Sequence, residues 1–280
     1  MRERIATNGW ALLSDVGSFE EAAADPRAFA ARILVEEPWL IERQPIRPIT
    51  GGRSFASSMM TTPFHTDSQM ALGVPPLFQL MLCVRPAASG GESVFLDTWP
   101  LLDTIAREDP RLHRDLFAVP RTAPFIFGDV SGPTVSRRGG HLVFTHSALT
   151  RDATADRLAP FMTAAPVIEV RPRRGDLIVA NNHRLLHGRR AFMDPAREFT
   201  RILAYSRNPI PAPVHLVESA REFEHATAVE RIERRQADVA REMVRGVPPG
   251  FLASRERVPE ALLYRWRDAV LLQSAAEVSR

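Results

Sequence analysis

The apolar positions along the first ~210 residues fall into short runs separated by glycine and proline. Runs of four to eight residues, rich in β-branched and aromatic side chains and bounded by turn residues, predict strands. They cover residues 10–13, 77–84, 93–97, 123–127, 141–144, 167–170, 177–181 and 199–205. Many short strands without a long alternation of strand and helix favour a sandwich or jelly roll.

A smaller part of this region has helical patterning. Ser18 precedes a predicted helix over residues 19–33, with Glu20 and Glu21 in its first turn, where the helix dipole favours anions. Further helical segments are predicted over residues 99–107, 111–117 and 152–162. Residues 34–64 are rich in Pro, Gly, Ser and Thr, so we expect irregular chain or short strands there.

The pattern changes after Pro213. Residues 218–245 and 259–278 have helical patterning with dense charge, and a Val-Pro-Pro-Gly break lies between them. We therefore predict a β domain over residues 1–213 and a helical extension over 214–280. Four apolar residues of this extension have helical spacing, namely Val229, Ile232, Val239 and Met243. They are expected to pack against the β core or to form a homo-oligomer interface.

Composition narrows the class of protein. The 280 residues are 45% hydrophobic and 25% charged, which is typical of a globular protein. We see no apolar run near the roughly 20 residues of a membrane span, and no signal-peptide core. The single cysteine, Cys83, cannot form an internal disulfide. A cytoplasmic protein without a membrane partner is the expectation.

All 36 Lys and Arg residues are arginines. The chain therefore has no lysine for a Schiff base or for a phosphate-binding loop. A net charge of +3 is small, so we predict no nucleic-acid partner.

Two separated motifs suggest metal chemistry. The first is Phe64-His65-Thr66-Asp67, in which residues i and i+2 of a strand point to one side. The second is the segment 182–189, which contains His187. Two imidazoles and one carboxylate bind one face of a non-haem Fe(II) and leave three positions open. His183, four residues before His187, is a rival ligand.

These motifs resemble those of the taurine dioxygenase and clavaminate synthase superfamily of Fe(II)/2-oxoglutarate oxygenases. The segment 63–67 is similar to its His-x-Asp motif, and Gly90-Gly91-Glu92-Ser93 to its Gly-Gly-Asp/Glu-Thr/Ser motif. The segment 182–189 resembles the distal-histidine strand of the γ-butyrobetaine hydroxylase branch. The three motifs occur in the family's order and span roughly residues 55–207.

The resemblance implies a double-stranded β-helix with a metal at one mouth. It implies that His65, Asp67 and His187 bind iron, while Arg201 and Ser93 bind the distal carboxylate of 2-oxoglutarate. Arg197 and Arg207 are the alternatives for the arginine. The implied reaction consumes O₂ and 2-oxoglutarate, releases succinate and CO₂, and hydroxylates or otherwise oxidises an unactivated C–H bond. Halogenases of the superfamily lack the carboxylate ligand, so Asp67 argues against halogenation.

The substrate is less defined. The chain has two tyrosines and four tryptophans, which argues against an aromatic cage for a quaternary ammonium. We expect a small polar metabolite, an amino acid or a natural-product intermediate, free or tethered to a carrier protein. A non-catalytic jelly-roll metal sensor and an interaction protein acting through its helical tail are the alternatives.

Overall fold

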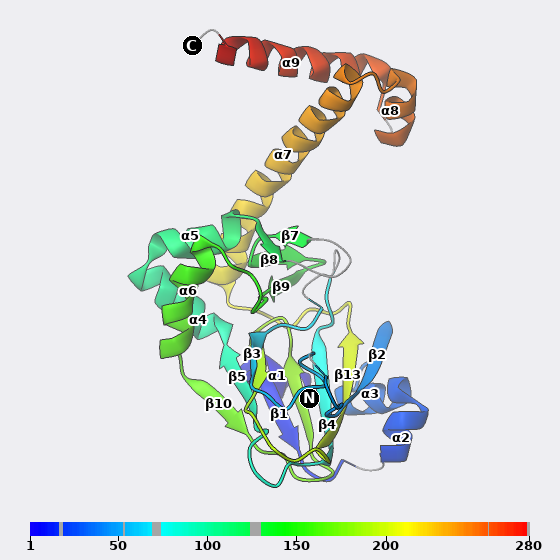
Figure 1. The fold of residues 1–280 in the computed structure, drawn as a ribbon, viewed down its shortest axis with the longest axis vertical. Coiled ribbons are helices and arrows are strands. Elements are labelled where there is room, and N and C mark those ends of the chain that lie inside the picture. The colour runs from blue at the N-terminus through cyan, green and yellow to red at the C-terminus, as the bar shows by residue number, and fades with distance from the viewer. Residues whose placement is uncertain (17–18, 53, 69–73, 124–129, 257, 279–280) are drawn as a thin grey trace. The chain divides into compact units, whose positions relative to one another are not determined.

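The computed structural model describes the chain apart from residues 17–18, 53, 69–73, 124–129, 257 and 279–280 (Figure 1). It divides into two compact units, residues 1–221 and 222–280. The first unit is mainly β with helices. Its strands pair antiparallel throughout the described residues, which confirms the coarse fold prediction.

Two sheets form the body of the first unit. The five-stranded sheet has the order β1 (Trp10–Leu13), β11 (Leu177–Asn181), β4 (Phe78–Arg85), β13 (Glu198–Tyr205) and β2 (Leu40–Ile46). The four-stranded sheet has the order β10 (Val167–Val170), β5 (Ser93–Asp97), β12 (Leu185–Arg189) and β3 (Thr62–His65). Two small hairpins are β6 (Arg121–Ala123) with β7 (Val130–Gly132), and β8 (Val135–Arg138) with β9 (His141–Phe144).

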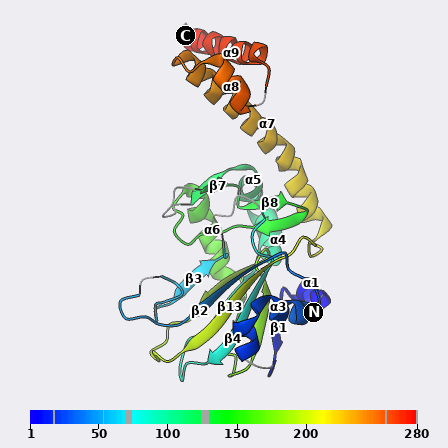
Figure 2. The ribbon, with the colours of Figure 1, turned by 90° about the vertical axis from the view of Figure 1, so that its right-hand side faces the viewer.

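The two faces of the five-stranded sheet have different partners. Its outer face carries Leu80 and Ile202, which pack against Phe29 and other apolar residues of α1 (Arg2–Asn8), α2 (Phe19–Ala24) and α3 (Pro26–Leu34). Figure 2 shows α1 and α3 beside this sheet. On the inner face, Ile178 clusters with Phe95 of the four-stranded sheet. The two sheets therefore pack face to face, because each alternates its side chains between two sides.

A second group of helices consists of α4 (Thr98–Glu108), α5 (Pro110–Ala118) and α6 (Ala153–Ala164), which lie together in Figure 1. Asp97 begins α4 by accepting a hydrogen bond from the Trp99 amide at 3.2 Å. Arg157 of α6 forms ion pairs with Asp109 and Asp115 at 2.8 and 2.7 Å, which join α6 to α5. This group extends from the end of β5, so its position is coupled to the four-stranded sheet.

The C-terminal helices are α7 (Val214–Val244), α8 (Pro249–Glu256) and α9 (Glu260–Val278). Val239 and Met243 of α7, Leu252 of α8 and Leu263 of α9 form a small core within the second unit. An ion pair of 2.7 Å between Arg255 and Glu242 joins α8 to α7. The predicted residues Val229 and Ile232 have side chains outside the described set.

One predicted element is wrong in its extent. The helix expected over residues 19–33 is two helices that meet at Asp25. The Asp25 carboxylate accepts the Ala28 amide at 2.9 Å, and Pro26, which has no N–H to continue a preceding helix, opens α3. Ser18 lies outside the described residues, as does most of the strand expected over 123–127. The helices α1 and α8 were not predicted.

Of the helices in the described ranges, not one combines the length and the apolar character needed to cross a membrane.

Candidate metal centre

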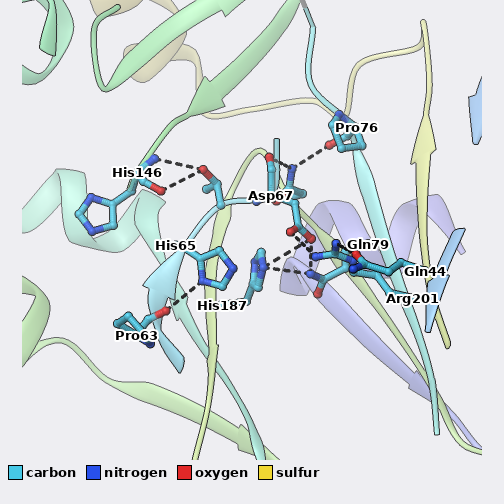
Figure 3. Close-up of polar contacts among 11 residues, drawn as sticks. Gln44, Pro63, His65, Asp67, Pro76, Gln79, His146, His187 and Arg201 are labelled. Carbon is cyan, nitrogen blue, oxygen red and sulfur yellow. Dashed lines mark hydrogen bonds and ion pairs between the residues drawn. The ribbon is translucent and has the colours of Figure 1, made fainter. Parts of the chain in front are cut away.

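Two neighbouring strands bring His65 and His187 together. His65 is the last residue of β3, His187 lies in the middle of β12, and the two are register partners in this antiparallel pair. Their ring centroids are 4.4 Å apart. Asp67 follows two residues after His65. Figure 3 shows the three side chains directed toward one another.

The three side chains form a compact donor set. The candidate ligand atoms of His65, Asp67 and His187 all lie within 4.8 Å of one another, and each residue is buried. Within the part of the chain that the structure describes, no other three metal-ligating residues approach so closely. Two imidazoles and one carboxylate match the donor set of non-haem Fe(II) centres.

The hydrogen bonds leave the donor atoms unprotonated. The Nδ1 of His65 lies 2.9 Å from the Pro63 carbonyl, which can only accept, so His65 Nε2 keeps its lone pair. The side-chain amide of Gln79 donates to Asp67 Oδ2 at 2.6 Å and lies 3.0 Å from His187 Nε2. Because an amide N–H donates, both atoms present lone pairs toward it. The set is therefore convergent and suited to a divalent metal.

Asp67 is held from several sides. Its Oδ1 forms an ion pair of 2.5 Å with Nη1 of Arg201, whose Nη2 donates to the Gln44 side chain. Its backbone amide donates to Oδ1 of Asn182 at 2.8 Å, and the Asn182 amide donates back to the Asp67 carbonyl at 3.2 Å. The motif residue Asn182 thus fixes the backbone of Asp67. Gln79 and Arg201 fix its carboxylate oxygens (Figure 3).

The electrostatics agree with this arrangement. Burial, followed by the electrostatic influence of the neighbouring His187, lowers the pKa of His65 to about 3, so this ring is neutral at neutral pH. Burial alone would raise the pKa of Asp67. However, His187, Arg201 and His65 together hold that pKa well below its usual range, so the carboxylate is ionised.

A pocket that is partly open to solvent adjoins the donor set. Its lining comprises Ile46, Phe55, Ala56, Thr62, His65, Gln79, Met81, Ser93, Phe95, His187, Gly188, Arg189, Arg197 and Arg201. The structure therefore brings Ser93 and Arg201, both predicted cosubstrate contacts, into one cavity with the two histidines.

The most isolated charge in the pocket is Arg197, which the sequence indicated only as an alternative to Arg201. Arg197 is 2% exposed and stacks over the Phe199 ring at 4.1 Å. Its Nη2 donates to the Gly91 carbonyl at 3.2 Å, but Nε and Nη1 have no partner among the described residues. Burial, then the nearby Arg189, lowers its pKa to about 10. A buried guanidinium with unpaired N–H groups is a candidate anion site.

Gly91 makes room for this side chain. Its φ is +74°, and a Cβ at this position would lie 3.0 Å from Arg197 Nε. The Gly-Gly pair of the sequence motif thus has a local reason, since a larger residue would crowd the guanidinium.

The remaining candidates have structural roles. The rival histidine His183 is turned away from the cluster and donates to the Pro75 carbonyl at 2.9 Å. Arg184 pairs with Asp97 at 2.6 Å. Arg189 donates to the carbonyls of the segment 55–60, which carries the pocket residue Phe55. The second alternative arginine, residue 207, is absent from the described pocket lining and lies over the Trp39 ring.

Comparison with known families decides the class. A family model described as "Taurine catabolism dioxygenase TauD, TfdA family" matches residues 1–167, more than half of the chain. The chain belongs to the TauD, TfdA family. The match includes His65, Asp67 and Ser93 and ends before His187. The resemblance that the sequence suggested is therefore confirmed, and the family's dioxygenases are enzymes of the Fe(II)/2-oxoglutarate superfamily, with O₂ as the further cosubstrate.

Individual family relatives are distant. "Dioxygenase str8" of Strobilurus tenacellus is 23% identical over 175 residues, which are 52% of this chain and 39% of that protein. The chain thus spans well under half the length of this curated relative.

Solved structures share the fold. Asparagine oxygenase with Fe(II), 2S,3S-3-hydroxyasparagine and succinate gives a TM-score of 0.56 at 15% identity, covering 74% of this chain and 78% of that one. The oxygenase OrfP with Fe and alpha-ketoglutaric acid gives 0.52 at 16% identity, with 74% and 78% covered. PvcB from Pseudomonas aeruginosa gives 0.52 at 20% identity, with 73% and 78% covered.

Proposed function

We propose that this chain is an Fe(II)- and 2-oxoglutarate-dependent dioxygenase that oxidises an unactivated C–H bond of a small polar molecule. The observation that carries this proposal is the buried His65, Asp67 and His187 cluster, which adjoins a pocket lined by the Arg197 guanidinium, two of whose nitrogens have no partner among the described residues. One half of the site suits a metal and the other half an organic anion. A protein that only bound metal would not require both halves.

In this proposal His65 Nε2, His187 Nε2 and an Asp67 carboxylate oxygen would hold the iron, which would replace the Gln79 amide at the single lone pair of His187 Nε2. Bound together, iron, 2-oxoglutarate and O₂ supply the oxidising power for C–H chemistry, with release of succinate and CO₂. The protein's own contribution is position. Asn182 and Gln79 orient Asp67, and the register of β3 with β12 fixes the two imidazoles.

We propose that Ser93, Arg197 and Arg201 hold the dicarboxylate. A guanidinium fork suits a carboxylate, and a hydroxyl can donate beside it. Arg201 is the residue expected from the sequence, but Asp67 and Gln44 already occupy both of its terminal nitrogens. Arg197 has two unpaired nitrogens, which supports its inclusion as a second anchor.

The pocket favours a small substrate. Its lining combines apolar side chains such as Ile46, Phe55 and Met81 with a few polar and charged groups, as small-molecule sites usually do. The asparagine oxygenase structure is a complex with an amino acid, 2S,3S-3-hydroxyasparagine. We therefore propose an amino acid or a related polar metabolite as the substrate class.

The type of β fold, the domain boundary and the assembly are also part of this proposal. Two antiparallel sheets facing each other, with the donor set at one end of the β3–β12 pair, fit a double-stranded β-helix. We propose that residues 1–213 form this oxygenase domain and that 214–280 are a helical extension through which copies of the chain associate. The single cysteine supports a cytoplasmic location.

Succinate release tests the activity. The protein is supplied with Fe(II), 2-oxoglutarate and air, and a panel of amino acids and polar metabolites is screened for stimulated succinate formation. His65→Ala and His187→Ala are expected to abolish stoichiometric metal binding and turnover. His215→Ala, at an exposed histidine that pairs with Asp103, is expected to retain both. Full metal occupancy with normal turnover in either ligand variant would reject the assignment.

A non-catalytic sensor is the alternative. It requires tight binding of Fe(II) and 2-oxoglutarate without succinate formation in the presence of any compound.

A further inference from the structure

One face of β2 continues from the pocket toward solvent. In a strand, residues i, i+2 and i+4 share a side. Ile46 of β2 lines the pocket, and Gln44 accepts a hydrogen bond from Arg201. Glu42 is the next residue on that side. Glu42 therefore lies along the same face as the groups that border the metal site.

Tyr205 links Glu42 to the metal motif. The Tyr205 hydroxyl donates to the Glu42 carboxylate, while its ring packs edge-on against Trp39 with centroids 5.4 Å apart. Tyr205 is 8% exposed. Burial, then the hydrogen bond to Glu42, raises its pKa to about 12, and both Ser68 and Asp67 also act on the hydroxyl. The hydroxyl therefore interacts with Glu42 and is also within electrostatic range of Asp67.

The carboxylates of Asp67 and Glu42 differ in whether a positively charged side chain accompanies them. Asp67 is buried and neutralised by Arg201. Glu42 is exposed on β2, and within the described ranges it forms no ion pair with an arginine or histidine. Among the described residues, Glu42 is therefore a solvent-exposed carboxylate without an arginine or histidine ion-pair partner, on the β2 face that leads from the pocket.

We propose that Glu42, positioned by Tyr205, determines specificity by binding a positively charged amine on the substrate. The substrate class is then a small molecule with a free ammonium group, such as an amino acid or a primary amine. An ammonium offers three donors, which a carboxylate accepts through charge-assisted hydrogen bonds. This inference rests on the proposed oxygenase function and adds the charge of the substrate to it.

The test compares matched pairs of compounds. Free L-amino acids and their Nα-acetyl derivatives are assayed with Fe(II) and 2-oxoglutarate, and succinate formation gives kcat/KM for each. The wild-type protein should prefer the free amine by at least about tenfold, the size expected for a hydrogen bond to a charged group. Glu42→Gln keeps the shape and an acceptor for Tyr205 but removes the charge. It should reduce the preference to within about threefold.

Two controls separate charge from folding. Glu169→Gln removes an exposed carboxylate on β10 that pairs with Arg190 and should leave the preference unchanged. Stoichiometric Co(II) binding by Glu42→Gln shows that this variant is folded with its donor set intact.

The possible outcomes are distinct. Equal turnover of free and acetylated compounds by the wild type overturns the inference about Glu42 but leaves the oxygenase function standing. The same holds if stimulation comes only from compounds without an amine, or if Glu42→Gln retains the full preference. Failure of the wild type to bind metal or to form succinate with any compound overturns the oxygenase function, and the inference with it.

Discussion

At the scale of single residues, the metal site depends on the hydrogen bonds and the ion pair that hold Asp67 in place. Arg201 and Gln79 hold its two carboxylate oxygens, and Asn182 holds its backbone. Such outer groups orient a metal ligand and tune its basicity, so their loss is expected to weaken metal binding without removing a ligand. Two residue-level predictions follow from this arrangement and from the unpaired Arg197.

Replacing Gln79 should weaken the metal site. Gln79→Leu removes the amide that orients Asp67 Oδ2 and is expected to lower Co(II) affinity by about 10-fold or more. Isothermal titration of the metal measures this directly. Gln236→Leu, in the second unit, serves as the control and should bind metal as the wild type does. Unchanged affinity in Gln79→Leu would mean that Arg201 and Asn182 suffice to position the carboxylate.

Replacing either pocket arginine should raise the requirement for 2-oxoglutarate, whereas replacing a surface arginine should not. Arg197→Ala and Arg201→Ala each remove a charge-assisted partner of the dicarboxylate, a loss of about 1.5–3 kcal/mol. The 2-oxoglutarate requirement should therefore rise at least about tenfold in each, while stoichiometric metal binding persists. Arg190→Ala, at an exposed ion pair with Glu169, should leave the requirement unchanged. A normal requirement in Arg201→Ala alone would assign the whole contact to Arg197.

The candidate metal-ligating residues could be predicted from the sequence, but most of the residues that surround and orient them could not. His65 and Asp67 stand out because the His-x-Asp spacing has a direct geometric meaning in a strand. Gln79 does not, since it lies inside an apolar run and its partners are 12 and 108 residues away. Arg197 is one of 36 arginines, and only the fold shows that it is buried without a full set of partners. Long-range polar contacts of this kind leave no local pattern.

At the scale of secondary-structure elements, the close approach of β12 to β3 sets the distance between the two imidazoles. Gly188 follows His187 at this point, and a Cβ there would lie 2.6 Å from the Thr62 carbonyl oxygen. Strand positions were predicted well where apolar runs were continuous, as for β4 and β11. The break between α2 and α3 was missed, because the pattern 19–33 remains helical while Asp25 and Pro26 interrupt the backbone.

Substituting Gly188 tests the strand contact. Gly188→Ala forces β12 away from β3, an overpacking that should lower the free energy of unfolding by about 1–3 kcal/mol. Metal affinity should also fall, since His187 moves with the strand. Gly132→Ala on β7 is the matched control because, among the described residues, its new Cβ would come within 4 Å of Arg138 Nη2 alone, at 3.7 Å. Urea unfolding and Co(II) titration of both variants provide the comparison, and equal stability would contradict the contact.

At the scale of the whole molecule, acid should destabilise the first unit through its buried histidines. Burial lowers the pKa of His183 to about 3, against an ordinary value of 6.5. The unfolded chain therefore binds a proton that the folded chain excludes. The resulting stability is present above pH 6.5 and is lost as the pH falls toward 3.

His183→Gln should reduce this pH dependence. Between pH 7 and pH 5, the metal-free wild type is expected to lose about 2 kcal/mol more stability than the variant. Urea unfolding with a chelator present, at both pH values, measures the difference. Identical pH dependence in the two proteins would show that His183 takes up its proton without unfolding.

The division into two compact units predicts how shortening the chain affects metal binding and stability. Leu216 and Ala220 of α7 are buried within the first unit, which ends at residue 221. A chain ending at 221 should bind metal with full stoichiometry. A chain ending at 213 also keeps the donor set, but its free energy of unfolding should fall by about 2–5 kcal/mol because the buried Leu216 is lost.

Light scattering of the full chain should show an oligomer that the 221-residue chain does not form. A full-length monomer at micromolar concentration would reject the role of the C-terminal helices in assembly.

The pairing of His65 with His187 makes any bound metal a cross-link between chain positions 122 residues apart. A ligand that binds only the folded chain adds about 1.4 kcal/mol of stability for each tenfold of free ligand above its dissociation constant. In a cell, the amount of this protein that escapes proteolysis would then follow the iron supply. Iron starvation would therefore lower the amount of the enzyme as well as its activity. The abundance of the protein would depend on iron availability, whatever its substrate is.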